Sequence, residues 1–347
     1  MIRAAAAAAL AVGALVASAA HAGEPTPPLD RLVGQKIMTA LDGASPDAAL
    51  LTRVRAGQVG GVILFSRNTV TTAELANEIE RLQAAAAAGG NPPLLVAVDQ
   101  EGGAVKRLAQ GPPDLSPASM GSPSQARSEG AATAAYLRRL GIDVDLAPVL
   151  DTPYGPASWL GSRAFSRSPK TNAQLGAAFV AGLQSGRVAA TAKHFPGLGT
   201  ARATTDTADV VLSTPRQALD ARLAPFRAAI DGGVDLVMVS NAGYTALDPT
   251  GAPAVLSRPI VTGLLRGALG FRGVTISDAL EAPGPRSRPD AAVRASLAGM
   301  DVLLYVSEAD SAAAYSQLLA AARDGSLPRA DLVDSWRRIE MLKRSVS

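Results

Sequence analysis

The sequence contains no cysteine, which excludes disulfide bonds and thiolate chemistry and leaves stability to a large core. Aromatic residues make up only 4% of the 347 residues, and no run of five or six basic residues occurs. A chain with few rings to stack on bases and no basic cluster is not expected to bind nucleic acid.

Long apolar stretches are also missing, since none reaches the roughly 20 residues of a membrane-spanning helix. A shorter apolar run, Ala4 to Val16, follows Arg3 and precedes the small-x-small site Ala20-His21-Ala22. We therefore expect residues 1–22 to be a signal peptide and the protein to be exported, to the periplasm or the medium, after cleavage near Ala22. A retained N-terminal anchor is the alternative.

The proline-rich stretch Glu24-Pro25-Thr26-Pro27-Pro28 indicates an extended linker over residues 23–30, because consecutive prolines fit neither a helix interior nor a sheet. We expect the fold to begin near Leu29. Residues 31–347 then form a single domain, whose size suits one α/β barrel.

Short apolar runs recur along the chain and alternate with helical segments. They are Met38-Leu41, Gly61-Phe65, Leu94-Asp99, Val144-Leu150, Ala190-His194, Leu236-Ser240, Val274-Asp278 and Val302-Tyr305. Runs that are apolar on both faces are typical of parallel strands covered by helices. Eight such units predict an α/β fold, a closed (β/α)8 barrel of the TIM type.

The clearest helix signal lies between the second and third of these strands. Thr71 and Glu74 form a capping box, Leu75, Ile79 and Leu82 share one face, and Gly89 is a stop.

Charged residues follow three of the predicted strands. The third ends in Asp99 and continues Gln100-Glu101-Gly102-Gly103, the fifth ends in Lys193-His194, and the seventh ends in Asp278. A single acid after a strand is more often a helix cap, but in a parallel barrel these three ends meet at one mouth. No phosphate loop or zinc-ligand spacing occurs, so we expect a carbohydrate-binding site without a metal or organic cofactor.

These segments resemble glycoside hydrolase family 3, in particular its single-domain bacterial β-N-acetylglucosaminidases. The resemblance runs from about Leu32 to Tyr305. It rests on residues 60–68 (GGVILFSRN), 98–103 (VDQEGG), 146–151 (LAPVLD), 163–165 (RAF), 193–197 (KHFPG) and 277–280 (SDAL).

The resemblance implies Asp278 as the nucleophile that forms a covalent glycosyl-enzyme. It implies that the sugar hydroxyls are held by five further residues, Asp99, Arg107, Arg163, Lys193 and His194. A nucleophilic carboxylate needs a partner that protonates the leaving oxygen and then activates water.

The loop that should supply this partner departs from the family pattern. In the family, the loop after the fifth strand continues as GHG and later as Asp-Ser-His, and the His is the acid/base. Here Leu198 replaces the first His, and by our count Ala208 falls where the second would lie. No other histidine can replace it, because His21 lies in the expected signal peptide and His194 is already assigned to sugar binding. We also expect no second domain that could supply a carboxylate. Asp206 is therefore the best candidate, ahead of Asp209 and Glu281; alternatively it only shapes the loop.

The sequence thus predicts a retaining exo-β-glycosidase acting on terminal β-N-acetylhexosaminides of cell-wall or other glycan fragments. Two alternatives remain. The chain could be a sugar-binding homologue with weakened turnover, since the His is missing, or phosphate could replace water as the acceptor, for which Arg202 is the one hint. Nothing in the sequence sets an oligomeric state.

Overall fold

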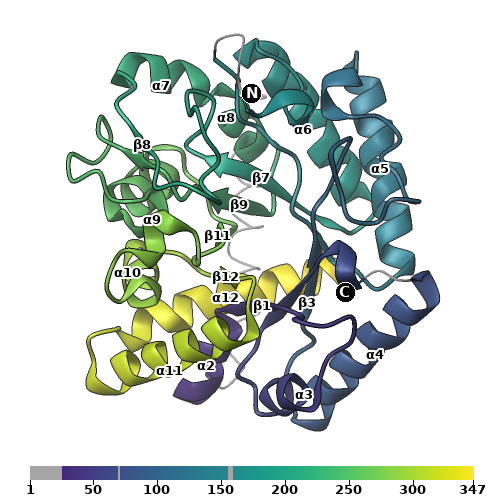
Figure 1. The fold of residues 1–347 in the computed structure, drawn as a ribbon, viewed down its shortest axis with the longest axis vertical. Coiled ribbons are helices and arrows are strands. Elements are labelled where there is room, and N and C mark those ends of the chain that lie inside the picture. Colours follow the sequence, from purple (N-terminus) through teal and green to yellow (C-terminus); the bar gives the residue numbers. More distant parts are fainter. Residues whose placement is uncertain (1–25, 69–70, 155–158) are drawn as a thin grey trace, which may run out of the picture.

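The computed structural model describes residues 26–68, 71–154 and 159–347, so the predicted signal peptide lies outside the described residues. Eight parallel strands form one sheet in the order β11-β9-β7-β6-β3-β2-β1-β12, with helices around it (Figure 1). The strands are β1 (Ile37–Ala40), β2 (Gly61–Leu64), β3 (Leu95–Val98), β6 (Val144–Asp145), β7 (Ala189–Phe195), β9 (Leu236–Val239), β11 (Val274–Ser277) and β12 (Leu303–Tyr305).

The sheet closes on itself. The last strand β12 pairs with the first, β1, and a parallel bridge between Ile276 and Val302 joins β11 to the start of β12. The predicted (β/α)8 barrel is therefore confirmed, and all eight predicted strands are present. The run predicted over 144–150 pairs continuously only at Val144–Asp145, because Pro148 has no N–H to donate; Val149 then bridges to Lys193.

The strands are apolar on both faces because each face meets a core. In β3, Leu95 and Ala97 belong to the cluster inside the barrel, whereas Val96 and Val98 belong to the cluster between strands and helices. Successive side chains of a strand point alternately into the two clusters. Because both clusters are apolar, the strand sequences show no alternation of apolar and polar residues.

Most strands lead into a covering helix. The helices are α2 (Leu29–Gln35), α3 (Ala48–Arg55), α4 (Thr72–Ala88), α5 (Pro123–Arg139), α6 (Pro169–Ser185), α7 (Arg216–Arg222), α8 (Ala224–Asp231), the π-helix η5 (Pro259–Ala268), α9 (Pro283–Arg286), α10 (Ala291–Ala298), α11 (Glu308–Asp324) and α12 (Arg329–Val346). The predicted cap of α4 is present, with the Thr71 side chain accepting a hydrogen bond from the Glu74 N–H at 3.1 Å.

Shorter elements decorate the barrel. Two-stranded pairs are formed by β4 (Gln100–Gly102) with β5 (Val105–Lys106) and by β8 (Val211–Leu212) with β10 (Gly243–Tyr244). The 3-10 turns are η1 (Ser66–Asn68), η2 (Pro117–Ser119), η3 (Gly161–Arg163) and η4 (Ala254–Leu256).

Helix α12 inserts Ile339, Leu342 and Val346 into the cluster inside the barrel. The interior is thus filled with side chains, as in other barrels of this type, and a ligand can enter only from the opposite end. In the part of the chain that is described, no helix combines the length and apolar character needed to cross a membrane.

Helix α2 packs on the loop after α3 through Gly34. A Cβ at this position would lie 1.8 Å from the backbone oxygen of Gly57, whereas at the exposed Gly43 it would lie 3.5 Å from the nearest atom. We expect Gly34→Ala to destabilise the protein by about 1–3 kcal/mol through overpacking. Gly43→Ala should stay within about 0.5 kcal/mol of wild type in urea unfolding. Equal stability of the two variants would contradict this packing.

Candidate functional site

A cavity of about 340 Å³ opens at the carboxyl ends of the strands. Its floor is apolar and consists of Ile63, Leu146, Met238 and Leu304, which belong to the cluster inside the barrel. All seven candidate residues line its wall: Asp99, Arg107, Arg163, Lys193, His194, Asp206 and Asp278. The fold therefore brings together side chains that are up to 179 positions apart, from 99 to 278 in the sequence.

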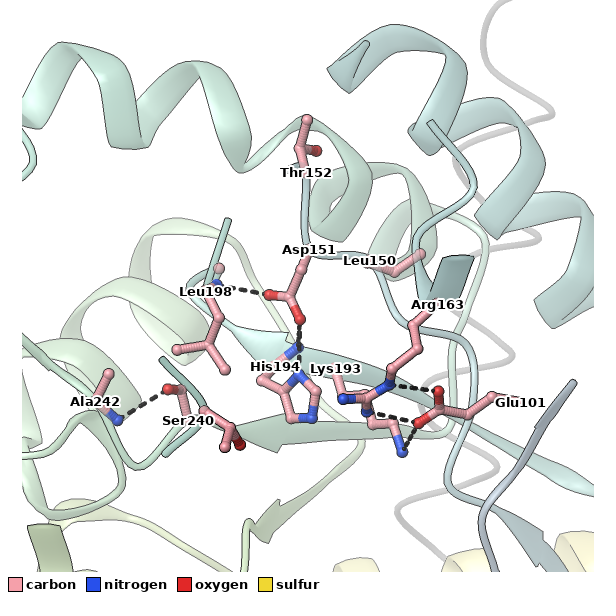
Figure 2. A network of polar contacts seen from close by, with 12 residues as sticks. Glu101, Leu150, Asp151, Thr152, Arg163, Lys193, His194, Leu198, Ser240 and Ala242 are labelled. Atoms are coloured by element: carbon pink, nitrogen blue, oxygen red, sulfur yellow. Dashed lines mark hydrogen bonds and ion pairs between the residues drawn. The ribbon is translucent and has the colours of Figure 1, made fainter. Parts of the chain in front are cut away.

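An ion network lines the cavity, and Figure 2 shows its members Glu101, Arg163 and Lys193. The Lys193 ammonium lies 2.7 Å from carboxylate oxygens of both Asp99 and Glu101. Arg163 binds Glu101 with two parallel hydrogen bonds of 2.8 Å, and Arg107 approaches Asp99 at 3.5 Å. Three cations thus surround two carboxylates, and the short distances are those of charge-assisted hydrogen bonds.

Burial and charge compete within this network. Burial alone would raise the pKa of Asp99 and of Glu101, but Lys193 and Arg163 hold the pKa of both carboxyls below its ordinary value. Burial would likewise lower the pKa of Lys193, but Asp99 and Glu101 hold it above its ordinary value. All members therefore stay charged at neutral pH.

His194 is oriented by a carboxylate from the segment after β6. Asp151 is fully buried and accepts hydrogen bonds from His194 Nδ1 at 2.7 Å and from the Leu198 N–H at 2.6 Å (Figure 2). This contact fixes the orientation of the His194 ring and leaves its Nε2 atom out of the contact with Asp151.

Asp278 follows β11 at the cavity wall. Its Oδ1 atom accepts a hydrogen bond of 2.8 Å from the N–H of Ala279, and it forms no ion pair with any described residue. Burial raises the pKa of Asp278; His194 opposes this shift, whereas the negative charge of Asp206 adds to it.

Asp206 lies in the long loop that joins β7 to α7. Its side chain is exposed but lines the cavity, and its Oδ2 atom accepts a hydrogen bond of 2.9 Å from the Thr204 hydroxyl. The neighbouring Ala208 and Asp209 do not line the cavity. Asp209 is exposed instead, with Arg288 at 3.9 Å. Asp206, rather than position 208, thus faces the site.

Glu281 also lines the cavity, and it has a structural role as well. Its Oε1 atom accepts hydrogen bonds from the N–H groups of Val306 and Ser307 at 2.8 and 3.1 Å, which ties the β11 loop to the end of β12. Burial raises the pKa of Glu281. The Oε2 atom is buried without a hydrogen-bond partner among the described residues.

Three contributors were not singled out from the sequence. Glu101 follows Asp99 by two positions, and this period of two in an extended segment is a signal for side chains on the same side. Asp151 ends a strand-like run as Asp99 and Asp278 do. Thr204 carries no such signal, because a hydroxyl residue in a loop is common. Within the described ranges, no three His, Asp or Glu side chains are grouped to hold a metal ion.

Comparison of the sequence with known families and proteins gives a consistent result. The family model described as Glycosyl hydrolase family 3 N terminal domain matches residues 29–342. A beta-hexosaminidase of Nitrosomonas eutropha is 38% identical over 268 residues, which cover 73% of this chain and 75% of that protein. A secreted glycosyl hydrolase of Arthroderma benhamiae is 33% identical over 350 residues, 96% of this chain and 99% of that one.

Solved structures are similar over nearly the whole chain. A family 3 β-N-acetylglucosaminidase of Paenibacillus superposes with a TM-score of 0.89 at 34% identity, covering 92% of this chain. This chain spans 63% of that longer protein. A β-N-acetylhexosaminidase of Beutenbergia cavernae superposes with a TM-score of 0.83 at 34% identity and covers 92% of this chain and 99% of its own.

The ion network makes a prediction about stability. In Glu101→Gln, Lys193 and Arg163 lose a buried partner, so the free energy of unfolding at pH 7 should fall by about 3–5 kcal/mol. Because the pKa of folded Glu101 lies below its ordinary 4.5, the ionised carboxylate stabilises above that pH and the contribution is lost on acidification. Urea unfolding should therefore show the deficit shrinking below pH 4.5, with exposed Glu80→Gln as a neutral control. A deficit independent of pH would contradict the account.

A second prediction concerns the two acids of the cavity. Because the charge of Asp206 raises the pKa of Asp278, Asp206→Asn should lower the pKa of Asp278. Asp209→Asn removes an equal charge from the same loop outside the cavity and should shift it less. Carboxyl ¹³C titration, with the Asp278 signal assigned by its loss in Asp278→Asn, measures both. Equal shifts in the two variants would show that Asp206 does not face Asp278.

Proposed function

The chain belongs to glycoside hydrolase family 3, and from this premise we propose that it is a retaining exo-β-glycosidase that hydrolyses terminal β-N-acetylhexosaminides. The observation that carries the proposal is a half-buried carboxylate, Asp278, in one cavity with a second acid, Asp206, and a cluster of sugar-hydroxyl donors. The substrate class follows that of the relatives from Nitrosomonas, Paenibacillus and Beutenbergia.

In the proposed mechanism, Asp278 attacks the anomeric carbon while Asp206 gives its proton to the glycosidic oxygen and the bond to the leaving group breaks. Asp206 then takes a proton from water, whose oxygen displaces Asp278 from the sugar. Retaining enzymes perform these steps with carboxyls about 5–5.5 Å apart.

The electrostatics of Asp278 favour a functional reading. Asp278 is half-buried and has no ion-pair partner among the described residues, and a carboxylate in such a place is typical of a reactive site. The His194 ring opposes the rise of the Asp278 pKa, which favours the ionised form that a nucleophile needs. By contrast, Asp99 and Glu101 are fully satisfied by their cations.

The shape of the cavity favours exo action. Its floor is closed by side chains of the barrel interior, so a glycan can enter with one end only. A volume of about 340 Å³ is at the small end of ligand pockets, which suits a terminal sugar rather than a long chain segment. We further propose that the enzyme is exported, on the sequence of residues 1–22 alone.

The proposal is tested with two β-N-acetylglucosaminides, one with a 4-nitrophenyl and one with a methyl leaving group. Asp278→Asn should abolish turnover of both. Asp206→Asn should reduce kcat/KM for the methyl glycoside by about 10²–10⁴-fold, the usual share of general acid catalysis, and much less for the activated one. Added azide should restore turnover of the activated substrate by Asp206→Ala as a β-glycosyl azide, because an anionic nucleophile attacks the glycosyl-enzyme without help from a general base.

Asp209→Asn serves as the matched control, and Glu281→Gln tests the other acid of the cavity. If Glu281→Gln alone shows the dependence on leaving group, Glu281 rather than Asp206 is the acid. If the sugar binds but neither glycoside is cleaved, the chain is a sugar-binding protein of this family and the proposal is wrong. If Asp278→Asn retains full activity, Asp278 is not the nucleophile and the proposed mechanism is wrong.

A further inference from the structure

The loop that carries Asp206 is attached to the barrel at several points. At its start, the Leu198 N–H donates to Asp151 and the Gly199 oxygen accepts from the Tyr154 N–H at 2.8 Å. A Cβ on Gly199 would lie 1.8 Å from the backbone oxygen of Thr152, so loop and barrel are in close contact there. The start of the loop has little room to move.

The rest of the loop is held as well. The hydroxyls of Thr200 and Thr214 lie 2.8 Å apart and close its base. Strand β8 pairs with β10, and Thr205, directly before Asp206, is 2% exposed and acts as an anchor in the wall of the cavity. The backbone is therefore anchored to the barrel on both sides of Asp206.

Thr204 completes the arrangement at the side chain. Its hydroxyl donates to Asp206 Oδ2 at 2.9 Å and accepts from the Asp206 N–H at 3.3 Å, and both residues line the cavity. One carboxylate oxygen is thereby committed to Thr204. The other, Oδ1, is the oxygen left to exchange a proton with a ligand.

We propose that Thr204 is the positioning residue of the acid/base, so that a Thr204–Asp206 pair on a fixed loop delivers the proton to the leaving group. This inference rests on the proposed function. Thr204 keeps its own proton in both steps: Asp206 Oδ1 loses its proton to the glycosidic oxygen in the first and regains one from water in the second. The hydroxyl acts by holding the carboxyl in the productive rotamer.

The test compares Thr204→Val, Thr204→Ser and Thr207→Val in the full-length chain. Thr207 is exposed, lies in the same loop and does not line the cavity, so Thr207→Val makes the same chemical change off the site. Thr204→Val should lower kcat/KM for the methyl glycoside about tenfold, the effect of one hydrogen bond to a charged group. The 4-nitrophenyl glycoside should change less than about twofold, since its departure hardly needs an acid.

Thr204→Ser should restore the methyl glycoside rate, because it retains the hydroxyl, and Thr207→Val should match wild type. A loss of equal size on both glycosides in Thr204→Val would show a structural role for the loop and overturn the inference, as would no loss on either. If Asp206→Asn shows its dependence on leaving group while Thr204→Val does not, only the positioning role fails. If Asp206→Asn shows none, the acid/base assignment itself is wrong.

Discussion

The buried carboxylate of Glu101 joins three segments of the barrel mouth. It comes from β4, binds Lys193 of β7 and accepts both hydrogen bonds of Arg163 from η3. Burying a charge costs several kcal/mol unless it is paired, so each member of this network needs the others. The ion network that would hold a sugar therefore also stabilises the fold, whether or not the chain turns substrate over.

That distinction gives Asp278 and Asp206 their weight. Neither is required by the Glu101 network: Asp278 is half-buried without an ion pair among the described residues, and Asp206 is exposed in a loop. A fold gains no stability from holding two acids across one cavity, because like charges repel. Such an arrangement is expected where chemistry demands it, and native proteins accept its cost.

The barrel could be predicted from the sequence because its physical cause is local and repeated. Each strand is buried on both faces and therefore apolar throughout, and eight such runs between helices leave few alternatives. The end of β6 was predicted less accurately. The run over 144–150 is apolar, but Pro148 removes one hydrogen-bond donor inside it and the strand is shorter than predicted. The seven candidate site residues were found from strand ends and family resemblance, and all seven line the cavity. Thr204 and Asp151 escaped prediction, because their importance lies in the hydrogen bonds they make across the fold.

The central claim, that Asp278 attacks the sugar, is tested most directly by trapping. A fluorinated N-acetylglucosaminyl fluoride with a slow second step should label the protein with one sugar, and peptide mass spectrometry should locate that sugar on Asp278. The label should be absent in Asp278→Asn and should disappear when an acceptor is added. A label on another carboxylate, or hydrolysis of the fluoride by the wild-type enzyme without any labelled peptide, would contradict the account.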